Sequence, residues 1–221
     1  MNIVIAGGHG QIAMLLHPLL TACGHQVRAL IRNPAQADEV RLAGAEPVLC
    51  DLEAEEDIAE AVGSADALVF AAGAGPGNGA ARKLTVDRDG AIRLIDVARQ
   101  NGIRRYVMIS AMNAEEPRGE EVFRTYLRAK AEADEALRQS GLDWTIVRPG
   151  RLTNDPPTGL VRLAAQLPRA EIPRADVAEV LACVLEAPRM TGWQFDVTSG
   201  DEEVAAALRR LVVGDGEARS E

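Results

Sequence analysis

The sequence predicts an α/β fold in which helices cover both faces of one doubly wound parallel sheet. Short apolar segments alternate with helical segments from residue 2 to residue 147, which is the pattern of successive βαβ units. The 221 residues are 47% apolar but only 3% aromatic, so the core must be aliphatic, as in sheets buried on both faces. The length and the apolar content predict one domain with a full core.

The first thirteen residues, MNIVIAGGHGQIA, predict a strand, a glycine turn and a helix. Such a turn brings the backbone close to a pyrophosphate, and the helix N-terminus offers free N–H groups to the anion. The spacing Gly7-x-x-Gly10-x-x-Ala13 has alanine where the third glycine is usual. A tight βα turn without a ligand is the alternative. The residues expected at the cofactor here are Gly7, His9, Gly10, Gln11 and Ile12.

The remaining elements follow in regular order. Further strands are predicted at His25–Ile31, Glu46–Cys50, Asp66–Ala71, Ile103–Ser110, Leu142–Val147 and Gln194–Val197. Helices are predicted at Gln11–Cys23, Ala35–Ala43, Glu55–Val62, Ala81–Gln100, Val122–Ser140 and Ala175–Glu186, with a last helix after residue 197. Within the single domain, residues 1–150 form the dinucleotide-binding core and residues 151–213 a small substrate-covering part with an irregular, proline-containing segment at 154–173. Residues 214–221 are expected to be a frayed tail.

Charge and cysteine content exclude several classes of protein. The net charge is −9 without a basic block, which argues against nucleic acid and anionic membrane surfaces as partners. The three cysteines are far apart in apolar contexts and form no metal-ligand set with the histidines; they are Cys23, Cys50 and Cys183. They are therefore expected to be small core residues of a protein in a reducing compartment. No targeting segment or apolar run of spanning length is evident, and a cytoplasmic location is expected.

Residues after the second, third and fourth strands indicate which dinucleotide binds. Arg32 stands at the tip of the second strand, where NAD sites commonly have an acidic residue, and arginine suits a 2′-phosphate. NADP is therefore expected rather than NAD. Asp51 and Leu52 follow the third strand and suit the adenine, with a turn aspartate as an equal alternative for Asp51. The small residues Ala71, Ala72 and Gly73 end the fourth strand and leave room for a ribose.

Three further residues predict acid–base chemistry. Tyr126 and Lys130 are four residues apart on a predicted helix and so share one face. The lysine ammonium is expected to lower the pKa of the phenol, which would make it a proton donor or acceptor near neutrality. Lys83 and Lys130 are the two lysines of the chain, so a chance pairing is improbable. Ser110 closes the fifth strand and would polarise a substrate carbonyl.

The combined motifs resemble the short-chain dehydrogenase/reductase superfamily, in particular its small atypical, NmrA-like and NAD(P)H-binding members. The segments that carry the resemblance are GGHGQIA, VRALIR, CDL, AAG, the stretch from VDRDG to VMIS, YLRAK, TIVRPG and PRADVAEV, which together cover residues 1–200. The resemblance implies a Rossmann-like fold with NADP along the sheet edge. It places Ser110 and Tyr126 beside the reacting carbon, Lys130 at the nicotinamide ribose, and Pro149 and Gly150 under the nicotinamide.

The expected function is that of an NADP-dependent oxidoreductase or epimerase-like enzyme acting on a small carbonyl or alcohol. A non-catalytic NADP(H)-binding regulator and a flavin- or biliverdin-reductase-like enzyme are the alternatives. Residues 112–121 and 152–173 are expected to line the substrate pocket, and they carry no motif that names a substrate. The chain is expected to be a monomer or a homodimer.

Overall fold

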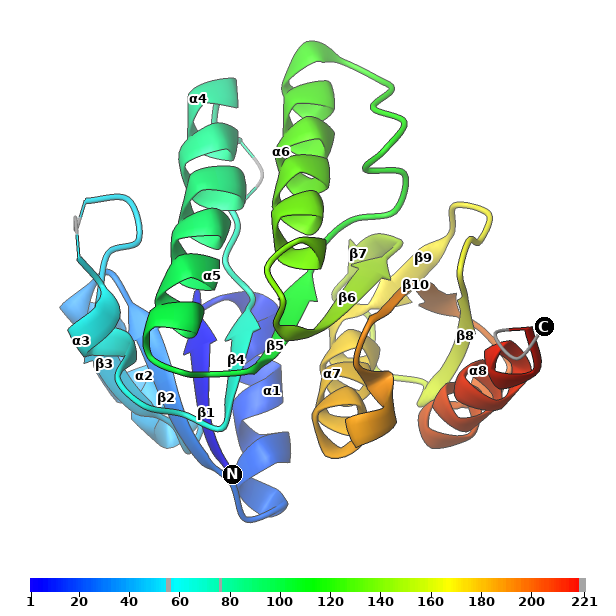
Figure 1. The fold of residues 1–221 in the computed structure, drawn as a ribbon, viewed down its shortest axis with the longest axis horizontal. Coiled ribbons are helices and arrows are strands. Elements are labelled where there is room, and N and C mark those ends of the chain that lie inside the picture. Colours follow the sequence, from blue (N-terminus) through cyan, green and yellow to red (C-terminus); the bar gives the residue numbers. More distant parts are fainter. Residues whose placement is uncertain (55–56, 76, 219–221) are drawn as a thin grey trace.

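The computed structural model describes residues 1–54, 57–75 and 77–218 and contains a nine-stranded sheet in its described part. The strand order is β11-β8-β10-β6-β5-β4-β1-β2-β3. Read from the β3 end, the first six strands are in the order 3-2-1-4-5-6, which is that of a Rossmann fold. Figure 1 shows helices on both sides of this sheet. The predicted fold class is therefore confirmed.

The strands that form the parallel part are short and mostly buried. They are β1 (Asn2–Ala6), β2 (Gln26–Ile31), β3 (Glu46–Leu49), β4 (Ala67–Phe70), β5 (Arg105–Ile109), β6 (Asp143–Pro149) and β10 (Trp193–Ser199). Alternate residues of β1 face opposite sides, because side chains in a strand alternate between faces. Ile3 and Ile5 pack on one side, and Val4 and Ala6 on the other.

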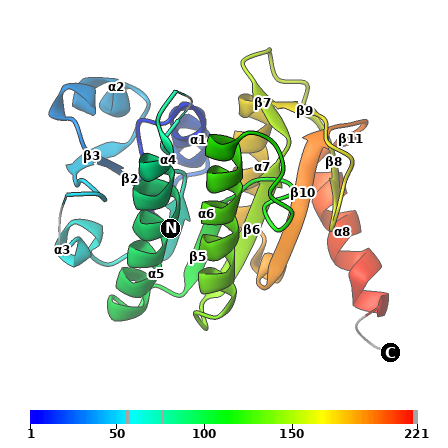
Figure 2. The same cartoon turned by 90° about the horizontal axis from the view of Figure 1, so that it is seen from above.

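Two groups of helices cover the two faces. The cluster on the first face includes buried residues of α1 (Gln11–Ala22), α2 (Ala37–Leu42), α7 (Arg174–Glu186) and α8 (Val204–Ala218). The cluster on the other face includes α3 (Ala59–Val62), α5 (Ala91–Gln100) and α6 (Glu121–Arg138). Figure 2 shows α5 and α6 side by side, across the sheet from α1 and α7. This two-sided covering explains why the central strands are largely apolar.

The long helix expected at Ala81–Gln100 has three parts in the structure. A single turn, α4 (Ala80–Arg82), leads into the π-helical segment η2 (Lys83–Gly90), which continues as α5. The buried side chains of η2 include Lys83 and Asp87, and η2 packs against α6. Wide π-helical turns of this kind are frequent at functional sites.

The region after residue 149 is more regular than expected. It contains β7 (Arg151–Thr153), β8 (Leu160–Ala164) and β9 (Glu171–Pro173), where an irregular proline-containing segment was predicted. β8 is antiparallel to β10, so the sheet is not parallel throughout. Arg162 points outward between buried Val161 and Leu163, which is the alternation of a half-buried strand near a sheet edge.

Some predicted boundaries and burials are corrected. α8 follows β11 (Glu202–Glu203) and reaches Ala218, so the helix extends into the expected tail; its buried apolar residues from Val204 to Leu211 belong to the core cluster on that face of the sheet. Short 3₁₀ turns precede α2 and follow α7, at Pro34–Gln36 and Pro188–Met190. Residues 55–56 of the predicted third helix lie outside the described residues. Cys50 is buried as expected, but Cys23 is exposed because it lies at the C-terminal end of α1.

Candidate active site and nucleotide cleft

A cleft of about 250 Å3 lies at the carboxyl ends of β1, β2, β3 and β4. This is the edge at which open α/β sheets bind ligands. Nine of the predicted cofactor residues line it, namely Gly7, His9, Gly10, Arg32, Asp51, Leu52, Ala71, Ala72 and Gly73. The structure therefore brings together residues from four separate turns of the chain.

Two glycines allow the close backbone packing beneath this cleft. Gly7 has φ +77°, and a Cβ there would lie 2.5 Å from Cα of Ala72. A Cβ on Gly8 would lie 2.5 Å from Cβ of Ala29. The buried His17 on α1 donates from Nε2 to the carbonyl of Gly8 at 2.7 Å. Because C=O and N–H of a trans peptide point in opposite directions, this bond turns the N–H of the next residue away from the helix.

Four predicted cofactor residues do not line the cleft. Gln11 is exposed in the first turn of α1, and Ile12 packs in the core. Pro149 and Gly150 end β6, where the N–H of Gly150 donates to the carbonyl of Val197 at 2.9 Å. They lie at the same sheet edge, on the side of the reactive cluster described below.

The end of the cleft beside β2 and β3 contains more charge than the sequence indicated. Arg32 is half exposed, and its Nη1 lies 3.5 Å from Oε2 of Glu53. Arg82 also donates to Glu53, with Nη2 at 2.6 Å from Oε2. Asp51 accepts the N–H of Glu53 at 2.9 Å, which is the turn role considered for it. Glu53 and Arg82 were not among the predicted residues, since neither belongs to the glycine or strand-end motifs.

A reactive cluster lies next to the cleft, where η2 and α6 meet the ends of β4 and β5. The ring of half-buried Tyr126 lies near two ammonium groups, with Nζ of Lys83 5.2 Å and Nζ of Lys130 6.0 Å from its centroid. Lys130 is buried, donates to the carbonyl of Ile109 at 3.1 Å, and pairs with Asp87 at 3.4 Å. The predicted tyrosine and lysine therefore do lie close together, and the chain's second lysine joins them.

The expected lowering of the tyrosine pKa is wrong. Burial, followed by the carboxylates of Asp87 and Asp134, raises the pKa of Tyr126 above its usual value. Asp87 offsets the charge of Lys130, because the carboxylate lies beside that ammonium. Tyr126 is therefore a neutral phenol at neutral pH. Burial, opposed by Asp87 and assisted by Lys130, lowers the pKa of Lys83.

Asp87 also fixes the loop after β4. Its Oδ2 accepts the N–H of Ala74 at 3.2 Å, and Lys83 donates to the carbonyl of Gly75 at 2.7 Å. Both side chains thus hold the backbone that follows Ala72 and Gly73 in the cleft. The spacing of Lys83 and Asp87, four residues apart in a helical segment, is the sequence signal that could have identified them.

Ser110 belongs to a buried polar network. Its hydroxyl donates to Oδ2 of Asp134 at 2.8 Å, and Arg148 donates to the same oxygen from Nη2 at 2.9 Å. Glu115 accepts from Nη2 of Arg148 at 2.7 Å and from Nη1 at 3.0 Å. Burial raises the pKa of Asp134, against the opposing effects of Arg148 and Ser110. Ser110 is thus held at the end of β5, with its proton directed to Asp134.

Other predicted features are placed as follows. In the expected substrate-covering region, the guanidinium of Arg169 lies over the ring of Phe123 on α6, 5.4 Å from its centroid. Among the residues that the structure describes, no three His, Cys, Asp or Glu side chains are grouped as metal ligands would be. Within the same residues, none of the helices combines the length and the apolar character needed to cross a bilayer.

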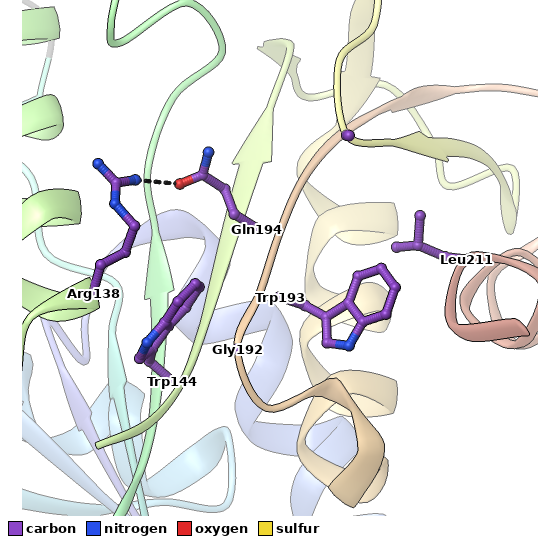
Figure 3. A pocket seen from close by; sticks show the side chains of 7 residues that line it. Arg138, Trp144, Gly192, Trp193, Gln194 and Leu211 are labelled. Atoms are coloured by element: carbon purple, nitrogen blue, oxygen red, sulfur yellow. Dashed lines mark hydrogen bonds between the residues drawn. The ribbon is translucent and has the colours of Figure 1, made fainter. Parts of the chain in front are cut away.

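A second pocket, of about 280 Å3, lies at the opposite ends of the strands. Trp144 and Trp193 stand near the starts of β6 and β10, away from the edge that carries the cleft. Figure 3 shows Trp144 below the hydrogen bond between Arg138 and Gln194, and Trp193 facing Leu211 of α8. This pocket contains none of the predicted site residues.

Comparison with known proteins identifies the family of the chain. A family model for NAD(P)H-binding proteins matches residues 7–188. A Bacillus subtilis protein named "Uncharacterized sugar epimerase YhfK" is 40% identical over 214 residues, which are 96% of this chain and 100% of that protein. A UPF0659 protein of Schizosaccharomyces pombe is 31% identical over 95% of this chain and 94% of its own length.

Solved structures of similar proteins agree with this family assignment. A putative NAD-dependent epimerase/dehydratase from Bacillus halodurans superposes with a TM-score of 0.91 and 39% identity, covering 96% of this chain and 100% of its own. The oxidoreductase ylbE from Lactococcus lactis superposes with a TM-score of 0.86 and 25% identity, covering 96% of this chain and 97% of its own.

Proposed function

This chain belongs to the NAD(P)H-binding family of small, atypical short-chain dehydrogenases/reductases, and we propose that it is an NADP-dependent oxidoreductase. The proposed substrate is a small carbonyl compound or the corresponding alcohol. The observation that carries the proposal is the position of Tyr126, a half-buried neutral phenol within about 6 Å of two lysine ammonium groups and adjacent to the nucleotide cleft.

The residues of the cleft fit a dinucleotide. Gly7 and Gly8 lack the Cβ atoms that would block the close packing of the loop beneath a pyrophosphate, and the N-terminus of α1 faces the same turn. Arg32 and Arg82 offer guanidinium groups of the kind that bind a phosphate in bidentate geometry. Asp51 and Leu52 would lie at the adenine, and Pro149 and Gly150 toward the nicotinamide.

The proposed chemistry uses three side chains of the reactive cluster. A bound nicotinamide supplies a hydride in reduction or accepts one in oxidation. Tyr126, neutral at working pH, would give its hydroxyl proton to the carbonyl oxygen of the substrate when the reaction runs as a reduction. The Ser110 hydroxyl would turn its proton from Asp134 to that oxygen and orient it, and Lys130 would reach a ribose hydroxyl from the face that it shares with Tyr126. Arg148 and Asp134 hold Ser110 in place.

Calorimetry followed by a substrate screen tests this proposal. NADPH should bind at least tenfold more tightly than NADH, a difference of about 1.4 kcal/mol. For a carbonyl substrate found in the screen, Tyr126→Phe should lower kcat by about 10²- to 10⁴-fold, the usual contribution of a general acid. Tyr106→Phe is the matched control, because Tyr106 is buried in the core of β5 and should leave kcat unchanged. Binding of neither nucleotide would refute the proposal.

A second candidate function, a flavin- or biliverdin-reductase-like enzyme, is favoured by the contacts of Lys130 and Ser110. Both side chains are buried and already bonded within the protein, to Asp87 and Asp134 respectively. A reductase that delivers hydride without a proton from tyrosine needs neither group free. Undiminished reduction by Tyr126→Phe would support this candidate. Cofactor binding without turnover, with a protein partner whose affinity differs between NADP+ and NADPH, would support a regulator.

A further inference from the structure

Glu53 lies between the two arginines of the cleft. Its carboxylate accepts from Arg82 at 2.6 Å (Nη2) and 3.2 Å (Nε), and from the hydroxyl of Thr85 at 2.6 Å. Arg32 approaches the same carboxylate from the tip of β2 at 3.5 Å. The three donors come from two distant segments of the chain, and they converge on one acidic group whose side chain is 24% exposed.

This donor set is the one that a phosphate monoester takes. Two guanidinium groups and a hydroxyl provide several charge-assisted hydrogen bonds to oxygen atoms in one place. Without an anion, the two guanidinium charges would repel each other, and Glu53 offsets part of that repulsion. The ion pairs of Glu53 are partly exposed, and such pairs contribute little free energy, so an incoming anion can displace the carboxylate.

We propose that Glu53 is an intramolecular competitor for the 2′-phosphate position, and that Glu53 and Arg82 together set the preference between NADPH and NADH. This inference rests on the proposed function, namely that the cleft binds a nicotinamide dinucleotide. A 2′-phosphate must displace the negatively charged Glu53 from Arg82 and Arg32. The unphosphorylated ribose instead offers hydroxyl groups, which a carboxylate in this position can accept.

The two cofactors should therefore respond to Glu53 in different ways. In Glu53→Gln, the side chain keeps its size but loses its charge, so NADPH should bind about tenfold more tightly. NADH should bind no more tightly than to the wild type, because it gains no contact and loses an acceptor. In Arg82→Met, NADPH should bind about tenfold more weakly and NADH should change less than twofold.

Calorimetric titration of the full chain with NADPH and with NADH measures the change in affinity of each variant for each cofactor. Glu60→Gln is the matched control, since it makes the same change of charge on exposed α3, outside the cleft, and should alter neither affinity. Thermal denaturation of every variant checks folding. Weaker or unchanged NADPH binding by Glu53→Gln would overturn the inference, as would an equal loss of both cofactors in Arg82→Met.

The outcomes separate this inference from the proposed function. A wild-type preference for NADPH that Glu53→Gln leaves unchanged overturns the inference alone. If the wild type binds NADPH and NADH equally and Glu53→Gln binds only NADPH more tightly, the inference is supported and the proposed preference for NADP is overturned. Binding of neither nucleotide, by the wild type or by any variant, overturns both.

Discussion

Replacement of Arg148 by methionine tests the buried network that holds Ser110. Arg148 and Asp134 are almost entirely buried, and the guanidinium donates twice to Oδ2 of the carboxylate, at 2.9 Å and 3.3 Å. In the described part of the chain, Oδ1 of Asp134 has no hydrogen-bond partner. Removing one member of such a pair leaves a buried charge, which costs about 3–5 kcal/mol of unfolding free energy. The Tm should fall by about 6–20 °C.

Urea denaturation followed by tryptophan fluorescence measures this loss. Arg138→Met is the matched control, because Arg138 is partly exposed and pairs at the surface with Glu135, and it should cost less than about 1 kcal/mol. The double variant Arg148→Met/Asp134→Asn should recover at least half of the loss, because it no longer buries an unpaired charge. A loss below about 1 kcal/mol for Arg148→Met, or strictly additive effects in the double variant, would refute the reasoning.

The sign of the pH dependence provides a second check on the same variant. Burial raises the folded-state pKa of Asp134, and Arg148 opposes that rise. Without Arg148 the pKa rises further, so the folded state binds a proton more tightly than the unfolded state does. A raised carboxyl pKa stabilises the folded protein as pH falls through it. The deficit of Arg148→Met should therefore be smaller at pH 5 than at pH 8.

Three further outcomes are expected. Gly8→Ala should lower the free energy of unfolding by about 1–3 kcal/mol, because the new Cβ overlaps Ala29. Adding Ala29→Gly should restore only part of this loss, since Cα of residue 29 would still lie 2.9 Å from the new Cβ. Denaturant unfolding measures both effects. Burial lowers the pKa of His17 in the folded state. Below pH 6.5 the unfolding free energy of the wild type should therefore fall by up to about 1.4 kcal/mol per pH unit relative to that of His17→Leu. The same dependence of unfolding free energy on pH in both proteins would contradict this. In Tyr106→Phe, absorbance at 295 nm should show no ionisation of Tyr126 at pH 10, where a rise would refute the assigned direction.

The arrangement of the dinucleotide-binding half can be predicted from the order of apolar and helical segments along the chain. Apolar strands that alternate with helices predict a parallel sheet with right-handed crossovers. In such a sheet the carboxyl ends of the strands lie at one edge. That is why Gly7, Arg32, Asp51 and Ala72, separated in the chain, could be assigned to one cleft. The tyrosine and lysine were paired correctly because their helical spacing is local.

The charge partners of the site residues cannot be predicted in this way, because they come from segments far apart in the chain. Lys130 was expected to act on Tyr126, but Asp87 on another helical segment pairs with that ammonium, and no local spacing relates the two residues. Ser110 is likewise directed to Asp134 of α6, and Glu53 to Arg82. The pKa of a buried group depends on every charge packed around it and on its loss of water. Sequence periodicity therefore indicates which groups meet at an edge, whereas packing decides which charges they retain.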